Sequence, residues 1–207
     1  MSKYGVFIIE SLRSGDYFDG ESMSQILELS SINNFYREVI SKEDFIKAIN
    51  EFKNSNFRYL HLSCHSDMEG IEINGENISN YELSILLKNK ITRKLIFLSA
   101  CQGSNRMMAS ALIIKCGGQS LIGTPVDLSF DKAALFWPSF YHVINNLDKT
   151  KMNKQNLDLV LKRCVDLFEI PINYYHGIKD YPDYLRRYKF RSNKRTSNNK
   201  ISAAKKL

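Results

Sequence analysis

Short apolar runs along the chain alternate with longer segments whose apolar positions recur every three or four residues. The runs are rich in β-branched and aromatic residues and predict strands at 4–11, 35–40, 58–64, 94–100 and 119–123. The longer segments predict helices at 21–29, 41–52, 81–89, 107–115, 131–145 and 156–168. Strands that alternate with helices favour parallel pairing through crossover connections. The pattern therefore predicts an α/β fold with a doubly wound, mostly parallel sheet.

Local signals mark the ends of several of these elements. Ser41, followed by Asp44, predicts the start of a helix by side-chain capping. The pair Asn74-Gly75, within "GIEINGENIS", is typical of a tight β-hairpin turn. Gly117-Gly118 indicates the end of the helix before it.

Composition fits a soluble globular domain, with 43% hydrophobic and 25% charged residues among 207. The N-terminal "MSKYGVFIIESLR" does not resemble a signal peptide, and no apolar run approaches the roughly 18 residues of a membrane span. The four cysteines show no paired spacing, which favours a reducing compartment over a disulfide framework. We expect a cytoplasmic protein without a membrane span.

Positive charge is concentrated near the C-terminal end. Residues 186–207 hold nine of the 29 basic residues and no acidic one, which leaves 20 basic residues against all 22 acidic residues elsewhere. We expect residues 1–185 to form one domain and residues 186–207 a flexible basic tail, able to contact nucleic acid or another anionic surface. Neither a phosphate-binding glycine motif nor metal-ligand spacing occurs, so we expect no cofactor and no metal.

Two predicted strands are followed at once by residues that can carry chemistry. His65 follows the strand in "FRYLHLSCHSDMEG", and Cys101 follows the strand in "RKLIFLSACQGSN". The carboxyl ends of neighbouring parallel strands share one edge of the sheet, where ligands bind in such folds. A thiol and an imidazole at that edge suit acyl transfer, with the thiol as nucleophile and the imidazole as general acid/base. The alternative for each residue alone is packing in the core, which is also the simpler interpretation of His61.

Four blocks of the sequence, in this order, resemble the CHAT domain, a relative of caspases, separases and gingipains. They are "YLHLSCHSDMEGIEI", "LIFLSACQGSNRMMASALI", "GGQSLIGTPVD" and "DKAALFWPSFYHVI", spanning roughly residues 57–146. "ACQG" at residues 100–103 also fits the end of the caspase signature, with Ser99 in place of its glutamine.

The resemblance implies a caspase-like three-layer α/β/α fold with a mostly parallel central sheet, and a cysteine endopeptidase. It makes Cys101 the nucleophile and His65 the general acid/base, without a metal. The oxyanion would be held by the backbone N–H groups of Cys101 and of Ser66, which stands where family members usually have glycine. By analogy, the protein would cleave a protein substrate as an effector that a separate sensor or partner protein activates, in a bacterial defence or stress pathway.

Two predicted loops are candidates for substrate selection. In related proteases the corresponding loops build the pocket for the residue before the cut; here they are residues 13–20 and 124–131. Any of Asp16, Asp19, Asp127 and Asp131 would pair with a basic substrate residue, and Arg13 with an acidic one; for Asp131 the alternative is a helix cap. Ser99, in place of the glutamine of the caspase signature, weakens the choice of an acidic residue, so a basic residue is favoured.

Two other functions remain open on the sequence. One is a catalytically inactive CHAT-like scaffold that binds a partner protein. The other is a nucleic-acid-binding protein that uses the basic residues of 186–207.

Overall fold

The chain folds around one mixed, mostly parallel β-sheet. The computed structural model describes residues 3–178 and 181–192, and within them the strand order is β2-β1-β3-β6-β7-β8-β9. The first five of these strands run parallel, and β8 and β9 add to the edge in antiparallel fashion. The strands of this path are β1 (Lys3–Ser11), β2 (Asn34–Glu38), β3 (Phe57–Ser66), β6 (Leu95–Ser99), β7 (Ser120–Gly123), β8 (Ile172–Ile178) and β9 (Tyr181–Phe190).

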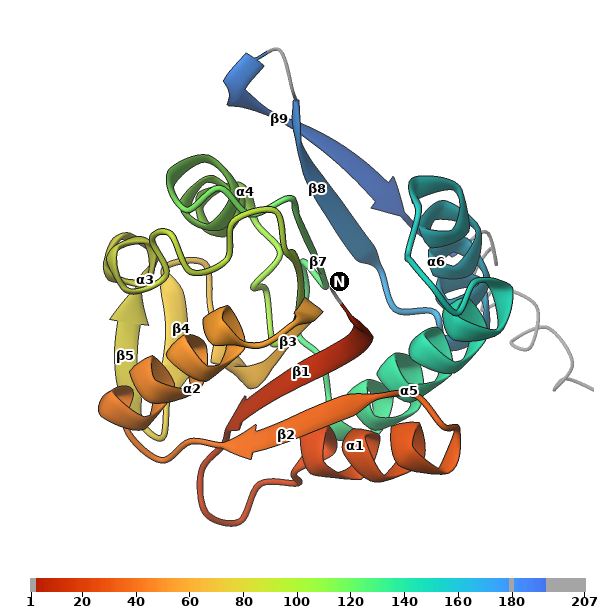
Figure 1. Cartoon of the computed structure of the whole chain (residues 1–207), viewed down its shortest axis with the longest axis horizontal. Helices are drawn as coiled ribbons and strands as arrows, with labels where there is room; N and C mark the ends of the chain where they lie inside the picture. Colours follow the sequence, from red (N-terminus) through yellow and green to blue (C-terminus); the bar gives the residue numbers. More distant parts are fainter. Residues whose placement is uncertain (1–2, 179–180, 193–207) are drawn as a thin grey trace, which may run out of the picture.

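Helices cover both faces of this sheet, so the fold has three layers (Figure 1). On one face lie α2 (Lys42–Asn54), α3 (Asn80–Leu86), α4 (Arg106–Ala109) and its π-helical continuation η1 (Ser110–Lys115). On the other face lie α1 (Asp19–Leu29), α5 (Phe130–Leu147) and α6 (Lys154–Phe168). Strand residues that point to the two faces enter two separate apolar cores, as the alternation of side chains along a strand requires. No helix among the described residues is long and apolar enough to cross a membrane.

The elements between residues 4 and 168 that the pattern predicts are all present, with ends that differ by a few residues. Ser41 caps α2, since its Oγ accepts the N–H of Asp44. The hairpin predicted at Asn74-Gly75 joins β4 (Gly70–Ile73) to β5 (Glu76–Ser79), and both turn residues have the positive φ of such a turn. The segment predicted as one helix at 107–115 is instead a short α-helix that continues with π-helical hydrogen bonding.

The predicted boundary between domain and tail is wrong. Residues 186–190 belong to β9, which pairs with β8 along the sheet edge, so the ordered domain extends beyond residue 185. Figure 1 shows β8 and β9 as a long ribbon at this edge. Burial of apolar side chains stabilises this edge, because Tyr174 and Tyr175 of β8 lie on opposite faces of the sheet, one in each apolar core. The rest of the predicted tail, residues 193–207, lies outside the described residues.

Candidate active site

The site is built where β3 and β6 end side by side. These strands are parallel neighbours, and their last registered pair is Ser63 with Ser99. Both serine hydroxyls donate to the carboxylate of Asp19, over 2.7 and 3.0 Å, so the two side chains share a face of the sheet. His65 follows Ser63 by two residues within β3, so strand alternation returns its side chain to that same face. Cys101 lies in the turn just beyond β6, and its contacts fix the direction of its side chain. Since adjacent strands lie about 4.8 Å apart, the fold brings the two predicted residues to one edge.

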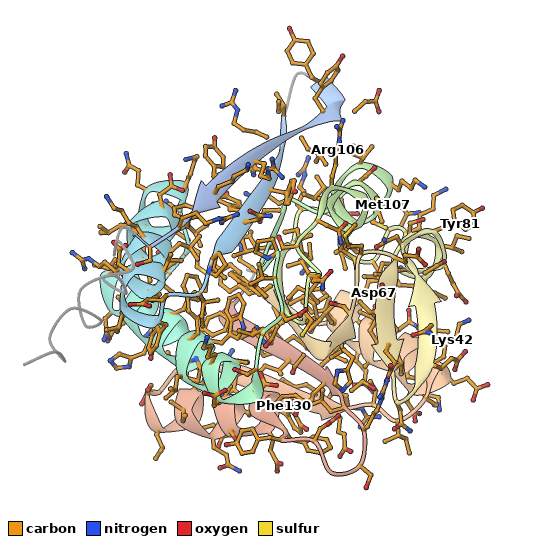
Figure 2. All side chains as sticks on the ribbon, turned by 180° about the vertical axis from the view of Figure 1, so that it is seen from behind. Lys42, Asp67, Tyr81, Arg106, Met107 and Phe130 are labelled. Atoms are coloured by element: carbon orange, nitrogen blue, oxygen red, sulfur yellow. The ribbon has the colours of Figure 1, made fainter. Side chains whose placement is uncertain are left out.

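A common loop contacts both side chains. The Cys101 Sγ accepts the N–H of Leu128 at 3.3 Å and lies 3.6 Å from the carbonyl oxygen of the same residue. The His65 ring lies edge-on to the ring of Phe130, with centroids 6.1 Å apart. Phe130 opens α5 and is labelled in Figure 2. Because Leu128 and Phe130 are two residues apart, these contacts independently place Cys101 and His65 against one short segment.

The chain turns sharply directly after Cys101. Gln102 has a φ of 52°, a left-handed conformation that costs free energy for a residue other than glycine. The turn is held by hydrogen bonds from Gln102 N–H to Val126 O (3.0 Å) and from Ser104 N–H to Thr124 O (3.1 Å). A side chain at Gly103 would meet Leu98 at 2.4 Å, so the turn also needs glycine there. This turn leaves Cys101 partly exposed at the edge of the sheet.

The other three cysteines are buried free thiols. Burial raises the pKa of Cys116 and of Cys164 to about 11, and raises that of Cys64 further. Among the four thiols, Cys101 is therefore the one that solvent reaches.

Ser66 is compatible with its position although a glycine was expected there. It is the last residue of β3 and is not among the residues with positive φ, so a side chain causes no backbone strain. Its hydroxyl donates a hydrogen bond to the carbonyl oxygen of Cys101. Ser66 therefore joins the ends of the two strands, in addition to its predicted backbone role, which remains a prediction.

The candidate substrate residues are all engaged within the chain. Asp16 contacts His65, with 2.8 Å between its Oδ2 and Nε2 of the ring. Arg13 forms an ion pair with Glu72 of β4. Asp127 accepts a hydrogen bond from the Gln102 side chain at 2.9 Å. Asp19 is 3% exposed, which excludes it from contact with a substrate and corrects that expectation.

A layer of buried polar groups lies directly beneath the site, and the sequence predicts only one of its members, His61, as a core residue. Besides Asp19, which binds Ser63 and Ser99, it contains His61, whose Nδ1 lies 3.0 Å from the hydroxyl of Tyr141. Burial raises the pKa of Asp19 to about 6 and lowers that of His61 to about 3. His61 is thus a neutral core histidine, which confirms the simpler interpretation.

A second buried carboxylate, Glu10, holds the start of α1. Its oxygens accept the N–H groups of Gly20 (2.6 Å) and Glu21 (3.0 Å) and the hydroxyl of Tyr36 (2.9 Å). Burial, the largest influence, raises the pKa of Glu10 to about 7, even though these donors oppose the change. The helix start that carries Asp19 is therefore fixed by a group that is expensive to ionise.

A cavity of about 410 Å³ opens beside His65. The row of residues His65, Glu72 and Asn77 across β3, β4 and β5 lines it, since these three pair in register. Asp67 and Glu69, both exposed, lie in its wall; Asp67 is labelled in Figure 2. The cavity thus offers an open space on the β4 side of the imidazole, and its charged lining groups are mainly carboxylates.

No protein-family model matches the chain, and no curated protein matches it.

Proposed function

We propose that this protein is a caspase-like cysteine endopeptidase with Cys101 as nucleophile and His65 as general acid/base. The observation that carries the proposal is the position of these two residues, at the carboxyl ends of neighbouring parallel strands, both against the segment from Leu128 to Phe130. The resemblance of residues 57–146 to CHAT domains implies a mostly parallel sheet between two layers of helices, and the observed architecture is of this general class.

The reaction follows from the chemistry of the two groups. The Cys101 sulfur attacks the scissile carbonyl carbon, and a C–S bond forms as the peptide C–N bond breaks. His65 takes the proton of the Cys101 thiol and gives it to the leaving amine. It then takes a proton from water, whose oxygen attacks the acyl carbon, and returns that proton to sulfur as the C–S bond breaks. The backbone N–H groups of Cys101 and Ser66 stabilise the tetrahedral oxyanion.

The acidic cavity beside His65 favours a substrate with a basic residue close to the cut. Asp67 and Glu69 supply negative charge there, whereas the charge of Arg13 is compensated by Glu72. A polypeptide laid across the sheet edge would place a neighbouring side chain in this cavity while its carbonyl meets Cys101. Activation by a separate partner protein completes the proposal by analogy with CHAT effectors.

Cleavage of a peptide library tests the proposal, with the Cys101→Ala variant as the matched control. We expect the wild-type protein to cut peptides that carry Lys or Arg close to the scissile bond, and Cys101→Ala to cut none. Equal cleavage by both proteins would assign the activity to another group or to a contaminant.

Thiol chemistry gives a second test that needs no substrate. We expect iodoacetamide to alkylate Cys101 at least about 10-fold faster in the wild-type protein than in His65→Ala, because the imidazole base generates the thiolate. Comparing one thiol in two proteins removes the effect of exposure. An inactive scaffold predicts equal rates, and that result together with an uncut library would refute the peptidase.

A further inference from the structure

The imidazole of His65 has a carboxylate partner from the loop after β1. The Nε2 atom lies 2.8 Å from Oδ2 of Asp16, and both side chains are partly buried, His65 33% and Asp16 23% exposed. An imidazole nitrogen that contacts a carboxylate carries the proton and donates it. The neutral ring then has its lone pair on Nδ1, which is the nitrogen that would take the thiol proton in the proposed reaction.

The carboxylate of Asp16 is itself fixed by its own loop. The same Oδ2 accepts the backbone N–H of Arg13 at 2.9 Å, and the N–H of Asp16 donates to the carbonyl of Arg13 at 3.1 Å. The two bonds close a tight turn over residues 13–16. The hydrogen bond to His65 is the main reason that the pKa of Asp16 lies below its usual value, so the carboxylate is ionised at neutral pH.

An ion pair anchors this turn to the strand beside His65. Arg13 donates from Nε to Oε1 of Glu72 at 2.6 Å and from Nη2 to the other oxygen of the same carboxylate. Glu72 is directly opposite His65 in the antiparallel pairing of β4 with β3, and it also accepts the N–H of Gly75. A bidentate pair of this kind fixes direction as well as distance. The loop that carries Asp16 is therefore tied to the strand next to its target.

We propose that Asp16 is a positioning residue that holds His65 in the tautomer with the proton on Nε2, and that the Arg13–Glu72 pair locks the loop presenting it. The inference deepens the proposed function, on which it rests: the pair Cys101 and His65 is completed by a third group contributed 49 residues before the histidine. It also gives Arg13 and Asp16 structural duties inside the site in place of contact with the substrate.

The tautomer of His65 can be observed directly by ¹⁵N NMR of histidine-labelled protein. The measurement compares the Cys101→Ala protein with the Cys101→Ala, Asp16→Asn double variant. The pH is kept high enough for the His65 ring to be neutral in both proteins. We expect the protonated Nε2 form alone with Asp16 present, and a mixture of tautomers with Asp16→Asn. This readout requires no peptidase activity, so it separates the failure of this inference from the failure of the proposed function. An unchanged tautomer in Asp16→Asn would overturn the inference even if the protein proved to be a peptidase.

Kinetics give the second readout. Asp16→Asn should lower kcat on the order of 100-fold with little change in KM, since the ring remains but is no longer oriented. Glu72→Gln, which weakens the anchor and leaves Asp16 in place, should lower kcat about 10-fold. Asp183→Asn, at an exposed carboxylate on β9, is the matched control and should leave kcat unchanged. A rise in KM with constant kcat in Asp16→Asn would instead assign Asp16 to substrate binding and refute the positioning role.

Discussion

His61 and His65 lie four residues apart on the same face of β3, yet their surroundings give them opposite properties. His61 is fully buried against Trp137 and Tyr141, and its Nε2 has no hydrogen-bond partner. His65 stands at the rim of the sheet, partly exposed, with Asp16 on its Nε2. Of the two histidines, only His65 is in contact with both solvent and a carboxylate.

The aspartates repeat this contrast. Asp19 and Asp16 are three residues apart in the chain, but Asp19 binds two serines inside the protein whereas Asp16 contacts the rim histidine. The molecule thus has an inner polar layer of His61, Asp19 and the two serines, and an outer layer of His65, Asp16 and Cys101. Distance from the sheet edge, more than residue type, therefore separates the buried structural groups from those that we propose to carry the chemistry.

The largest expected difference between the layers is in activity. His65→Ala should lower kcat/KM on the order of 1000-fold, because the general acid/base is lost while the partly exposed position tolerates alanine. His142→Ala, on the exposed side of α5, is the control and should retain full activity. Peptide cleavage assays measure both, and circular dichroism confirms that each variant is folded. A His65→Ala protein with wild-type kcat/KM would place the chemistry elsewhere.

Substitutions in the inner layer should instead change the stability of the folded protein. His61→Ala should lower the free energy of unfolding by about 2–4 kcal/mol, since it opens a cavity between Trp137 and Tyr141. Urea denaturation measures this change, with His142→Ala again as the exposed control. The catalytic rate per folded molecule should stay near wild type. A collapse of that rate in a fully folded His61→Ala protein would contradict the division into two layers.

Sequence reasoning succeeds where the signal is local. The strands at β1, β3 and β6, the cap at Ser41 and the Asn74-Gly75 turn each depend on residues a few positions apart, and the structure confirms them. The structure also places His65 and Cys101 at the ends of adjacent strands, because β3 and β6 are neighbours. The strands at 172–190 were missed because their tyrosines and basic residues resemble a polar arm until β7 provides an edge to pair with.

The partners of the site residues depend on contacts between distant parts of the chain. Asp16 reaches His65 because β1 is the other neighbour of β3, which puts the loop after β1 at the same sheet edge. The resemblance places this loop near the site as part of a substrate pocket, but the sequence pattern does not contain the strand order that brings Asp16 to His65 instead. Asp19 resembles a surface loop residue in sequence, and only the position of α1 against β3 and β6 buries it.

A smaller effect concerns pH and the buried carboxylates that support the inner layer. Glu10 has its pKa raised from 4.5 to about 7, so the folded protein binds a proton that the unfolded chain has released between these values. Its contribution to stability is therefore fully present below about pH 4.5 and is lost as the pH rises through about 7. Asp19 acts in the same direction, between 3.8 and about 6.

Glu10→Gln should remove part of this dependence. Relative to the wild type, the variant should gain on the order of 2 kcal/mol in free energy of unfolding between pH 5 and pH 8. Urea denaturation across this range measures the difference, with Glu28→Gln, at an exposed position on α1, as the control. Parallel pH profiles for Glu10→Gln and the wild type would show that Glu10 is ionised without cost.

The smallest effect is expected at Ser66, the residue that joins the strand ends of the outer layer. Ser66→Gly removes the hydrogen bond to the Cys101 carbonyl and adds backbone freedom in β3, which should lower the free energy of unfolding by about 1 kcal/mol. The backbone N–H remains, so kcat/KM should fall less than about 10-fold. Ser66→Ala separates the two causes, because it removes only the hydroxyl. If Ser66→Gly instead raised kcat/KM well above wild type, the serine would be a brake on the site, and the bond between Ser66 and Cys101 would hold the nucleophile in a less reactive position.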